Sequence, residues 1–488
     1  MASVNIPLLV GTSGGLPVSA SPQRVWNLYP TVSPASKEKV VWKNTPGYDE
    51  WGAVSAGNGR AMIVHKNNLY FVVGIGVFRA TAKTNIELLG TISSSLNEVT
   101  MASDGFNLLI ADGENIYYFD TSVTIAGPDP GAIKVVSIPF SHPFSITFHD
   151  GHFVAREGGS GKFWISDKYD GLTWDALQFA TAEDKPDDLV EIASDKFLWL
   201  FGEYTTQAYY NDGSTFPFKP NQQSNMRYGI IGKTAVVVDN TIAWLARTSQ
   251  GQMRAIKAQG FQPVPISTPE LEAEWSEYSK VDDAYALSIQ WHGKEWYVLT
   301  FPTENKTYVY DPAGVWFEWG NYNSGLDTLE AVDFKAYAFW ENQNLCLASN
   351  GKIYQLKDDV YNHDGEVMVS QFISNVQHVD EQRLIFHSLI YDMHTGAGPT
   401  NTESSINTSL SYDGGYTYDN WMERSLGIEG DYSKRIQWHK LGSGYNITIR
   451  SRITDEVPRQ FLKAVANIDV YAPYLDRRNS RAGLPGEN

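Results

Sequence analysis

One pattern recurs along the sequence, although its residues differ from copy to copy. It consists of a two-residue turn, a short apolar strand, a second turn and a strand rich in aromatic residues. One copy begins at Asn67 and the next at Asp104. The second turn residues of the seven copies, spaced 37 to 53 residues apart, are Asn68, Gly105, Gly151, Asp195, Asn240, Gly293 and Asn344.

This repeat cannot be stable as a single unit. A lone hairpin leaves its apolar face in water, so the hairpins must stack on one another, and closing the stack into a ring removes the free ends. Repeats of about 40–50 residues made of hairpins are typical of β-propeller blades. The sequence therefore predicts an all-β fold whose main element is a β-propeller of six or seven blades.

Composition and strand pattern divide the chain into four segments. Residues 1–52 lack the repeat and contain six prolines, which favour extended backbone, so we expect an extended N-terminal arm lying along the protein or a neighbouring subunit. The repeats place the propeller at 53–362. In 363–472 the strands are longer and alternate more regularly, which predicts an appended C-terminal β-sandwich. Residues 473–488 are predicted to be a flexible tail.

Charge and apolar runs limit the classes of partner, and the cysteine content indicates the compartment in which the chain folds. The formal net charge is −18, so the surface repels phosphate; DNA could pass it, but tight wrapping is not expected. No run of 18 apolar residues and no secretory leader is present, which predicts no membrane insertion. Cys346, the only cysteine, lies in an apolar strand and is expected to be buried, which suits folding in a reducing cytoplasm.

Two local segments stand apart from this pattern. Ser267-Thr268-Pro269 precedes an apolar i, i+4, i+7 stripe, which predicts a short surface helix. Residues 476–481 form the only compact basic cluster. A solvated tail is the simpler interpretation of this cluster, and a binding arm is the alternative.

The most specific short motif matches the Asp box, S-x-D-x-G-x-T-aromatic. Its residues are Ser411, Asp413, Gly415, Thr417 and Tyr418. In such a turn the carboxylate and the hydroxyls bind the backbone, and the aromatic residue is expected to plug the core. The motif therefore predicts a structural hairpin turn without a catalytic role.

Candidate catalytic and metal-binding residues are few. An Asp-Gly turn would place His149 and His152 opposite each other, but two ligands are too few for a zinc site. The acidic loop 183–188 lacks the ligand spacing of a calcium loop. We therefore predict no catalytic, cofactor or metal site, although a glycosidase that uses two carboxylates stays an alternative because such a pair forms only in space.

Several islands of sequence resemble the packaged-DNA stabilisation proteins, also called tail hub or nozzle proteins, of short-tailed bacteriophages. They include Asn27-Leu28-Tyr29-Pro30 near the start and Trp438-His439-Lys440-Leu441-Gly442 near the end. The remaining islands are 45–47, 198–203, 208–210, 216–218, 228–232, 239–245, 264–269 and 449–452. Their order and spacing cover most of residues 5–470.

The resemblance implies a structural virion protein of the tail, assembled in the host cytoplasm, and not an enzyme. It implies a homohexameric ring below the portal and the head-to-tail adaptor protein, which retains packaged DNA and forms its exit channel. Tail fibres or tailspikes would dock on this ring, and a needle or plug protein would close it. Family members are described with six-bladed propellers, one fewer than the hairpins counted in this sequence.

Arm residues are the candidate subunit contacts. Trp26, Tyr29 and Trp42 could anchor a neighbouring subunit, because buried aromatic residues dominate interface energies; packing inside their own core is the alternative. Two other functions remain open at this stage. One is a propeller that binds or hydrolyses glycans, and the other is a protein that binds a host receptor.

Overall fold

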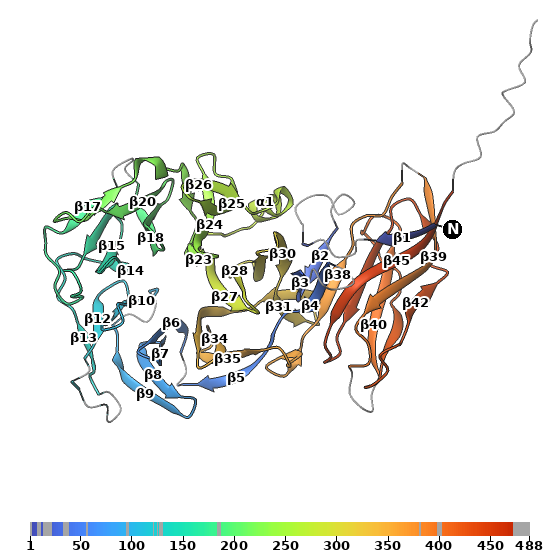
Figure 1. Ribbon diagram of the computed structural model, residues 1–488, viewed down its shortest axis with the longest axis horizontal. Coiled ribbons are helices and arrows are strands. Elements are labelled where there is room, and N and C mark those ends of the chain that lie inside the picture. The colour runs from blue at the N-terminus through green and yellow to red at the C-terminus, as the bar shows by residue number, and fades with distance from the viewer. Residues whose placement is uncertain are drawn as a thin grey trace, which may run out of the picture.

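The computed structural model describes residues 2–6, 11–12, 22–32, 39–54, 57–93, 97–120, 122–123, 125, 130–182, 187–379, 382–397 and 403–471. In these residues the helical elements are α1 (Pro269–Ser276) and the 3-10 turn η1 (Gln222–Ser224), and the rest of the regular structure is β. Figure 1 shows a ring of small sheets with an elongated block of strands beside it. The predicted all-β architecture of a propeller with a sandwich is therefore confirmed.

The first four blades each contain four strands that follow one another in the chain. The strands of blades 1 and 2 are β6 (Gly59–His65), β7 (Asn68–Val73), β8 (Gly76–Ala82), β9 (Asn85–Thr91), β10 (Thr100–Ser103), β11 (Leu108–Ala111), β12 (Ile116–Phe119) and β13 (Ile133–Val135). The strands of blades 3 and 4 are β14 (Pro143–His149), β15 (His152–Glu157), β16 (Lys162–Ile165), β17 (Phe179–Thr181), β18 (Leu189–Ser194), β19 (Leu198–Gly202), β20 (Thr206–Asn211) and β21 (Phe218–Pro220).

Blades 5 to 7 complete the ring. Blade 5 contains β22 (Tyr228–Ile230), β23 (Val236–Val238), β24 (Thr241–Thr248), β25 (Met253–Gln259) and β26 (Gln262–Pro265). Blade 6 contains β27 (Tyr285–Trp291), β28 (Lys294–Phe301), β29 (Lys306–Asp311) and β30 (Val315–Glu318), and it is followed by the hairpin of β31 (Gly320–Asn323) and β32 (Thr328–Ala331). Blade 7 contains β33 (Phe334–Trp340), β34 (Gln343–Ala348), β35 (Lys352–Lys357) and β5 (Gly47–Ala53).

Each of the seven sequence motifs forms the first hairpin of one blade. The first turn of blade 1 is Lys66-Asn67, directly before Asn68, and that of blade 7 is Glu341-Asn342, two residues before Asn344; they connect β6 to β7 and β33 to β34. The described part of the chain therefore forms seven blades, as many as the hairpins, and not the six that the resemblance implied. The predicted short helix is α1, where the Thr268 side chain accepts a hydrogen bond from the Leu271 N–H and so caps the first turn.

The N-terminal segment closes the ring. β5 pairs antiparallel with β35, in a register that joins Gly47 to Lys357 and Ala53 to Lys352. The outer strand of blade 7 thus precedes the first strand of blade 1 in the chain, so blade 7 cannot be completed without it. The last part of residues 1–52, predicted as an extended arm along the protein or a neighbouring subunit, is thus a strand of the propeller.

The other strands of residues 1–52 belong to the sandwich. One of its sheets contains β1 (Ala2–Ile6), β3 (Leu28–Val32), β4 (Val40–Asn44), β39 (Arg383–Met393), β42 (Ile436–His439), β43 (Ser443–Gly444) and β45 (Gln460–Tyr471). The other contains β2 (Arg24–Trp26), β38 (Ser370–Ile373), β40 (Ser404–Ser411), β41 (Met422–Gly427) and β44 (Thr448–Ile453). The hairpin of β36 (Asn362–His363) and β37 (Glu366–Val367) joins the sheet of blade 7, so the predicted boundary after residue 362 falls inside this hairpin.

Strand β2 joins the two domains. It lies between β30 of blade 6, where Trp26 pairs with Glu318, and β38 of the sandwich. One nine-stranded sheet therefore runs from the propeller into the sandwich. The tail predicted at 473–488 lies outside the described residues.

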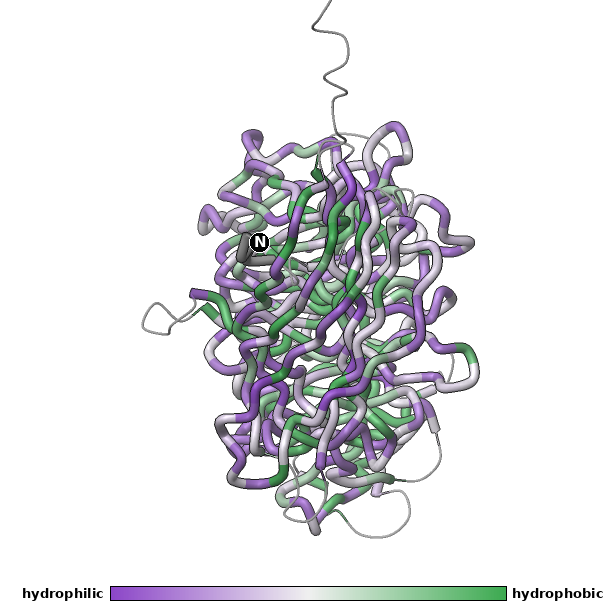
Figure 2. Tube along the Cα trace, turned by 90° about the vertical axis from the view of Figure 1, so that its right-hand side faces the viewer, coloured by the Kyte–Doolittle hydropathy of each residue, from purple (hydrophilic) through white to green (hydrophobic). Residues whose placement is uncertain are grey.

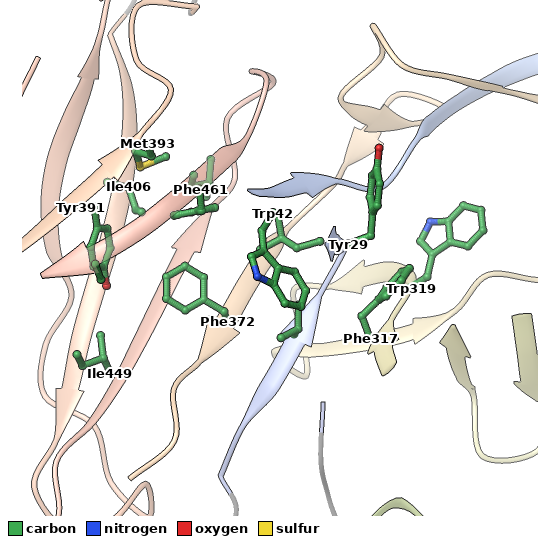
Figure 3. Packing of buried hydrophobic residues seen from close by; sticks show 14 of the residues in the cluster. Tyr29, Trp42, Phe317, Trp319, Phe372, Tyr391, Met393, Ile406, Ile449 and Phe461 are labelled. Carbon is green, nitrogen blue, oxygen red and sulfur yellow. The ribbon is translucent and has the colours of Figure 1, made fainter. Parts of the chain in front are cut away.

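A shared hydrophobic core supports this connection. In Figure 3, Tyr29, Phe317 and Trp319 lie on the propeller side of Trp42, and Phe372 and Phe461 lie on its sandwich side. All of these side chains are buried and belong to one contiguous cluster. The two domains therefore pack as one body.

The outer sheet of the sandwich is amphipathic. Figure 2 shows hydrophobic and hydrophilic residues alternating along its strands, and β39 alternates between buried and more exposed residues in the same way. This period of two is what a sheet with one buried face requires. Within the described residues, no helix is long and apolar enough to cross a membrane.

Candidate functional site

The Asp-box turn connects β40 to β41 and forms the expected hydrogen bonds. Ser411 Oγ lies 2.6 Å from Asp413 Oδ1 and accepts from the Gly415 N–H at 2.8 Å. The Asp413 carboxylate accepts from the N–H groups of Tyr416 and Thr417 and from Thr417 Oγ1. These bonds, first from Ser411 and then from Thr417, hold the pKa of Asp413 well below its usual value. The turn is a structural device.

Tyr418 does not plug the hydrophobic core as the motif predicted. Its ring lies 4.3 Å from the guanidinium of Arg450, which lies 4.4 Å from the ring of Trp421 on its other side. Two residues along β44, Arg452 continues the series between Trp421, at 5.2 Å, and Tyr322 of the β31–β32 hairpin, at 5.3 Å. The Asp-box turn is thus linked to the propeller by a stack of alternating aromatic and cationic groups.

The three candidate interface residues are inside the protein. Trp26, Tyr29 and Trp42 are 9%, 1% and 5% exposed. The Tyr29 ring meets the ring of Trp296 of blade 6 edge to face at 5.0 Å. Tyr29 and Trp42 belong to the core shared by propeller and sandwich, and Trp26 lies in β2 between the two domains. In this chain they therefore anchor the two domains to each other, and they offer no exposed ring to a neighbouring subunit.

The histidine pair is engaged elsewhere. His149 and His152 face each other across the β14–β15 hairpin, as predicted. His149 Nδ1, however, lies 2.8 Å from Ser194 Oγ of blade 4, and His152 Nδ1 lies 2.8 Å from the Ser166 carbonyl oxygen. No group of three or more His, Cys, Asp or Glu side chains in the described part of the chain could hold a metal ion.

The remaining candidates also have structural roles. Cys346 is fully buried, and burial raises the pKa of its thiol. Of the acidic loop, residues 183–186 lie outside the described residues. Asp187 accepts hydrogen bonds from the N–H groups of Glu203, Tyr204 and Thr205, so it shapes the turn between β19 and β20.

A polar cavity of about 510 Å³ lies at the centre of the propeller. It is bounded mainly by residues at or near the starts of the inner strands of the blades. Its charged lining residues are Arg60, Glu98, Glu191, Lys233, Asp283 and Lys335. These residues lie far apart in the sequence and meet only when the ring closes, so the sequence analysis missed them. Their common position at or near the start of an inner strand is the signal that could have identified them.

The charges in this axial cavity are largely balanced. Lys233 Nζ lies 2.5 Å from Glu98 Oε2. Lys335 Nζ lies 4.2 Å from the ring centre of Tyr285, the one aromatic residue of the lining. Burial raises the pKa of Glu191 to about 7, although its carboxylate accepts a hydrogen bond of 3.0 Å from the Ala235 N–H and lies near Lys233. The cavity thus pairs acids with cations and offers little aromatic surface on which a sugar ring could stack.

Comparison with known proteins identifies both domains. A family model described as bacteriophage P22 Gp10, beta-propeller, matches residues 4–361, and one described as bacteriophage P22 Gp10, beta-sandwich, matches residues 370–469. No curated protein matches the chain.

Similarity to solved structures is remote. A catalytically inactive virginiamycin B lyase from Staphylococcus aureus with quinupristin has 12% identity and a TM-score of 0.45, over 64% of this chain and 98% of the other. The WD40 β-propeller domain of Doa1 has 10% identity and a TM-score of 0.41, over 64% and 97%. Neither bears on function.

The two family matches follow each other along the chain as the propeller and the sandwich do. They divide between 361 and 370, where the β36–β37 hairpin gives way to β38. Together they cover most of the sequence. The chain therefore belongs to the bacteriophage P22 Gp10 family of packaged-DNA stabilisation and tail-hub proteins, and it is a structural protein of a phage tail.

Proposed function

We propose that this protein forms a ring of six subunits below the portal and adaptor of a short-tailed phage. The ring retains the packaged DNA, forms its exit channel and docks tail fibres or tailspikes, and a needle or plug closes it until infection. The ring is assembled in the host cytoplasm and remains in the virion tail. In this proposal the protein is not an enzyme and needs no cofactor.

The observation that carries the proposal is the rigid connection between the two Gp10 domains. The nine-stranded sheet crosses the junction through β2, and the shared core fills the space beside it. Sliding one domain against the other would break strand pairing and expose apolar surface at once. A stiff subunit of this kind suits the wall of a tube that holds DNA under pressure.

Charge supports the role of a channel wall. The chain carries a net charge of −18, and a ring multiplies that charge around one axis. An acidic wall does not adsorb phosphate, so DNA can pass it without binding. The proposal therefore requires DNA to be retained by geometry and by the plug, and not by affinity for the wall.

Assembly with the adaptor tests the proposal. The purified chain should be mixed with the adaptor ring and the mass of the complex measured, with each component alone as reference. Six copies of the chain per complex are expected. A persistent monomer that ignores the adaptor would contradict the proposal, and turnover of an envelope polysaccharide by the purified chain would favour the glycan-active alternative.

A particle assay tests the retention of DNA. Phage lacking the protein should package DNA and then lose it, and supplying the protein in trans should restore filled heads. Quantifying DNA inside purified heads by nuclease protection measures this directly. Heads that stay filled without the protein would contradict the retention role while leaving ring formation open to the mass measurement.

A further inference from the structure

A groove of about 530 Å³ opens beside the junction of the propeller and the sandwich. Its walls come from the β31–β32 hairpin, from strands β5 and β35 of blade 7, and from the β36–β37 hairpin. Three tyrosines and three carboxylates dominate the lining: Tyr48, Tyr322, Tyr354, Glu330, Asp364 and Glu366. The groove therefore combines negative charge with aromatic rings.

No lysine or arginine lines this groove. The axial cavity, in contrast, contains Arg60, Lys233 and Lys335, and a third cavity beside blade 4 contains Lys196 and Lys257. Among these three cavities only the junction groove carries acids that no lining cation balances.

The cations beside the groove leave two of its acids free. Arg452 lies over the Tyr322 ring at 5.3 Å and pairs with Asp327 Oδ1 at 2.6 Å. Lys352 Nζ lies 2.7 Å from Glu50 Oε2 and 3.3 Å from Asp364 Oδ2, so it is already engaged. Glu330 accepts a hydrogen bond of 2.6 Å from the Asn323 amide. Within the described residues neither Glu330 nor Glu366 has an ion-pair partner. Both carboxylates are therefore available to a cation from outside.

His363 provides a second sign of a missing partner. Its ring stacks on Tyr48 at 4.5 Å and 9° and is 3% exposed. Neither ring nitrogen has a hydrogen-bond partner in the described part of the chain. Burial lowers the pKa of this histidine to about 3, so it is neutral and adds no positive charge to the groove. A neutral imidazole can donate one hydrogen bond and accept another.

Carboxylates beside tyrosine rings recognise arginine well. The guanidinium group donates to carboxylates in a planar fork and stacks on aromatic faces at the same time. The matching chemistry in this sequence is the basic cluster Arg477, Arg478 and Arg481, which follows the last described strand.

We propose that the junction groove binds the arginine-containing C-terminal segment, residues 473–488, of a second copy of this chain. The groove supplies the carboxylates of Glu330 and Glu366 to the guanidinium groups. Tyr48 and Tyr354 are only 5% and 7% exposed, so Tyr322 is the lining tyrosine with ring surface to offer. The segment would thus act as a strap between subunits. This inference rests on the groove and on the charges of the C-terminal segment. It does not depend on the role proposed for the protein in the phage tail.

The length of β45 argues against binding within one chain. Arg459 contacts Met368 and Ser370 close to the groove, and β45 then runs from Gln460 to Tyr471, away from it, over about 36 Å. From Tyr471 a fully extended chain reaches about 21 Å at Arg477 and about 35 Å at Arg481. The first arginines thus fall short of their own groove, whereas a neighbouring copy can be reached.

Peptide binding tests the proposal. A fluorescent peptide of residues 473–488 is titrated, with anisotropy as the readout, into the full chain and into a chain ending at residue 472. Saturable binding that weakens with added salt is expected. Replacing the three arginines of the peptide by glutamine should abolish it. The double variant Glu330→Gln/Glu366→Gln should weaken binding about three- to tenfold. Glu423→Gln, which removes one exposed carboxylate outside the groove, should leave it unchanged.

The second test measures self-association of the chain by sedimentation. The full chain should self-associate more strongly than the chain ending at residue 472, and the groove variant should behave like the shortened chain. No peptide binding at millimolar concentration, equal binding of a scrambled basic peptide, or equal weakening by Glu423→Gln would each overturn the proposal. Hexamer formation on the adaptor is measured separately, so either idea can fail alone.

Discussion

Asn27 and Gly320 bind each other reciprocally across the domain junction. Asn27 Nδ2 donates to the Gly320 carbonyl oxygen at 3.0 Å, and the Gly320 N–H donates back to Asn27 Oδ1 at 2.9 Å. The same amide donates to the Val369 carbonyl oxygen at 2.9 Å. Asn27 is fully buried and has a φ of 52°, a left-handed conformation that asparagine tolerates better than most residues. One side chain thus ties the N-terminal segment to both domains.

Asn27→Ala should strongly destabilise the protein. The change removes three hydrogen bonds, leaves buried backbone groups without partners and places alanine at a positive φ. We expect the free energy of unfolding to fall by about 3–5 kcal/mol, measured by chemical denaturation. Asn85→Ala, which alters an exposed turn hydrogen bond to Thr81, is the control and should cost under about 1 kcal/mol. Equal losses in the two variants would contradict the role given to Asn27.

Trp42→Ala should loosen the junction. Trp42 is 5% exposed inside the shared core, so its removal leaves a cavity between the domains. A loss of about 3–5 kcal/mol is expected in chemical denaturation. We expect one unfolding transition for the parent, because its domains share a core, and two for the variant. Trp421→Ala is the matched control, because Trp421 is 38% exposed and gives up mainly cation–π contacts worth about 1 kcal/mol. One unchanged transition in Trp42→Ala would mean that the domains are not coupled through this residue.

The repeat was readable in the sequence because each hairpin is local. The turns Lys66-Asn67 and Glu341-Asn342 are formed by adjacent residues, and the alternation of the flanking strands reports burial directly. The pairing of β5 with β35 was not readable, since it joins segments about 300 residues apart and no periodicity records a distant partner. The extended character of residues 1–52 was thus recognised without its place in the sheets.

The candidate residues also differ in whether their contacts could be predicted. Contacts within one turn could be predicted from the sequence, and contacts between distant segments could not. The hydrogen bonds around Asp413 follow from spacing within one turn, and the structure contains them. The contact of Tyr418 with Arg450 depends on the packing of β44 against that turn. Trp42 illustrates the remaining difficulty: an aromatic residue looks the same in sequence whether it fills its own core or a partner's.

Asp413→Ala should affect the Asp-box turn locally. The carboxylate accepts hydrogen bonds from Tyr416 and Thr417, and its loss should cost about 1–2 kcal/mol and accelerate amide exchange in residues 411–419. Because the pKa of Asp413 is lowered in the folded state, its contribution is present above about pH 4 and is lost as the pH falls. Asp419→Ala, at an exposed position beside the turn, should leave the exchange rates unchanged. Similar exchange in both variants would count against the structural role of the turn.

Glu191 should make the propeller less stable as the pH rises. Burial raises its pKa from 4.5 to about 7, so the folded state holds this proton more tightly than the unfolded chain does. Unfolding therefore releases a proton between about pH 4.5 and 7, and the free energy of unfolding falls as the pH rises through this interval. In Glu191→Gln the side-chain oxygen can still accept from the Ala235 N–H, but this titration is absent. Relative to the parent, the variant should gain about 3 kcal/mol between pH 4.5 and pH 8, measured by denaturation at each pH. Glu423→Gln, at an exposed site, should follow the parent curve. A Glu191→Gln curve parallel to that of the parent would mean that the carboxyl group titrates normally, and that Lys233 and the backbone offset its burial.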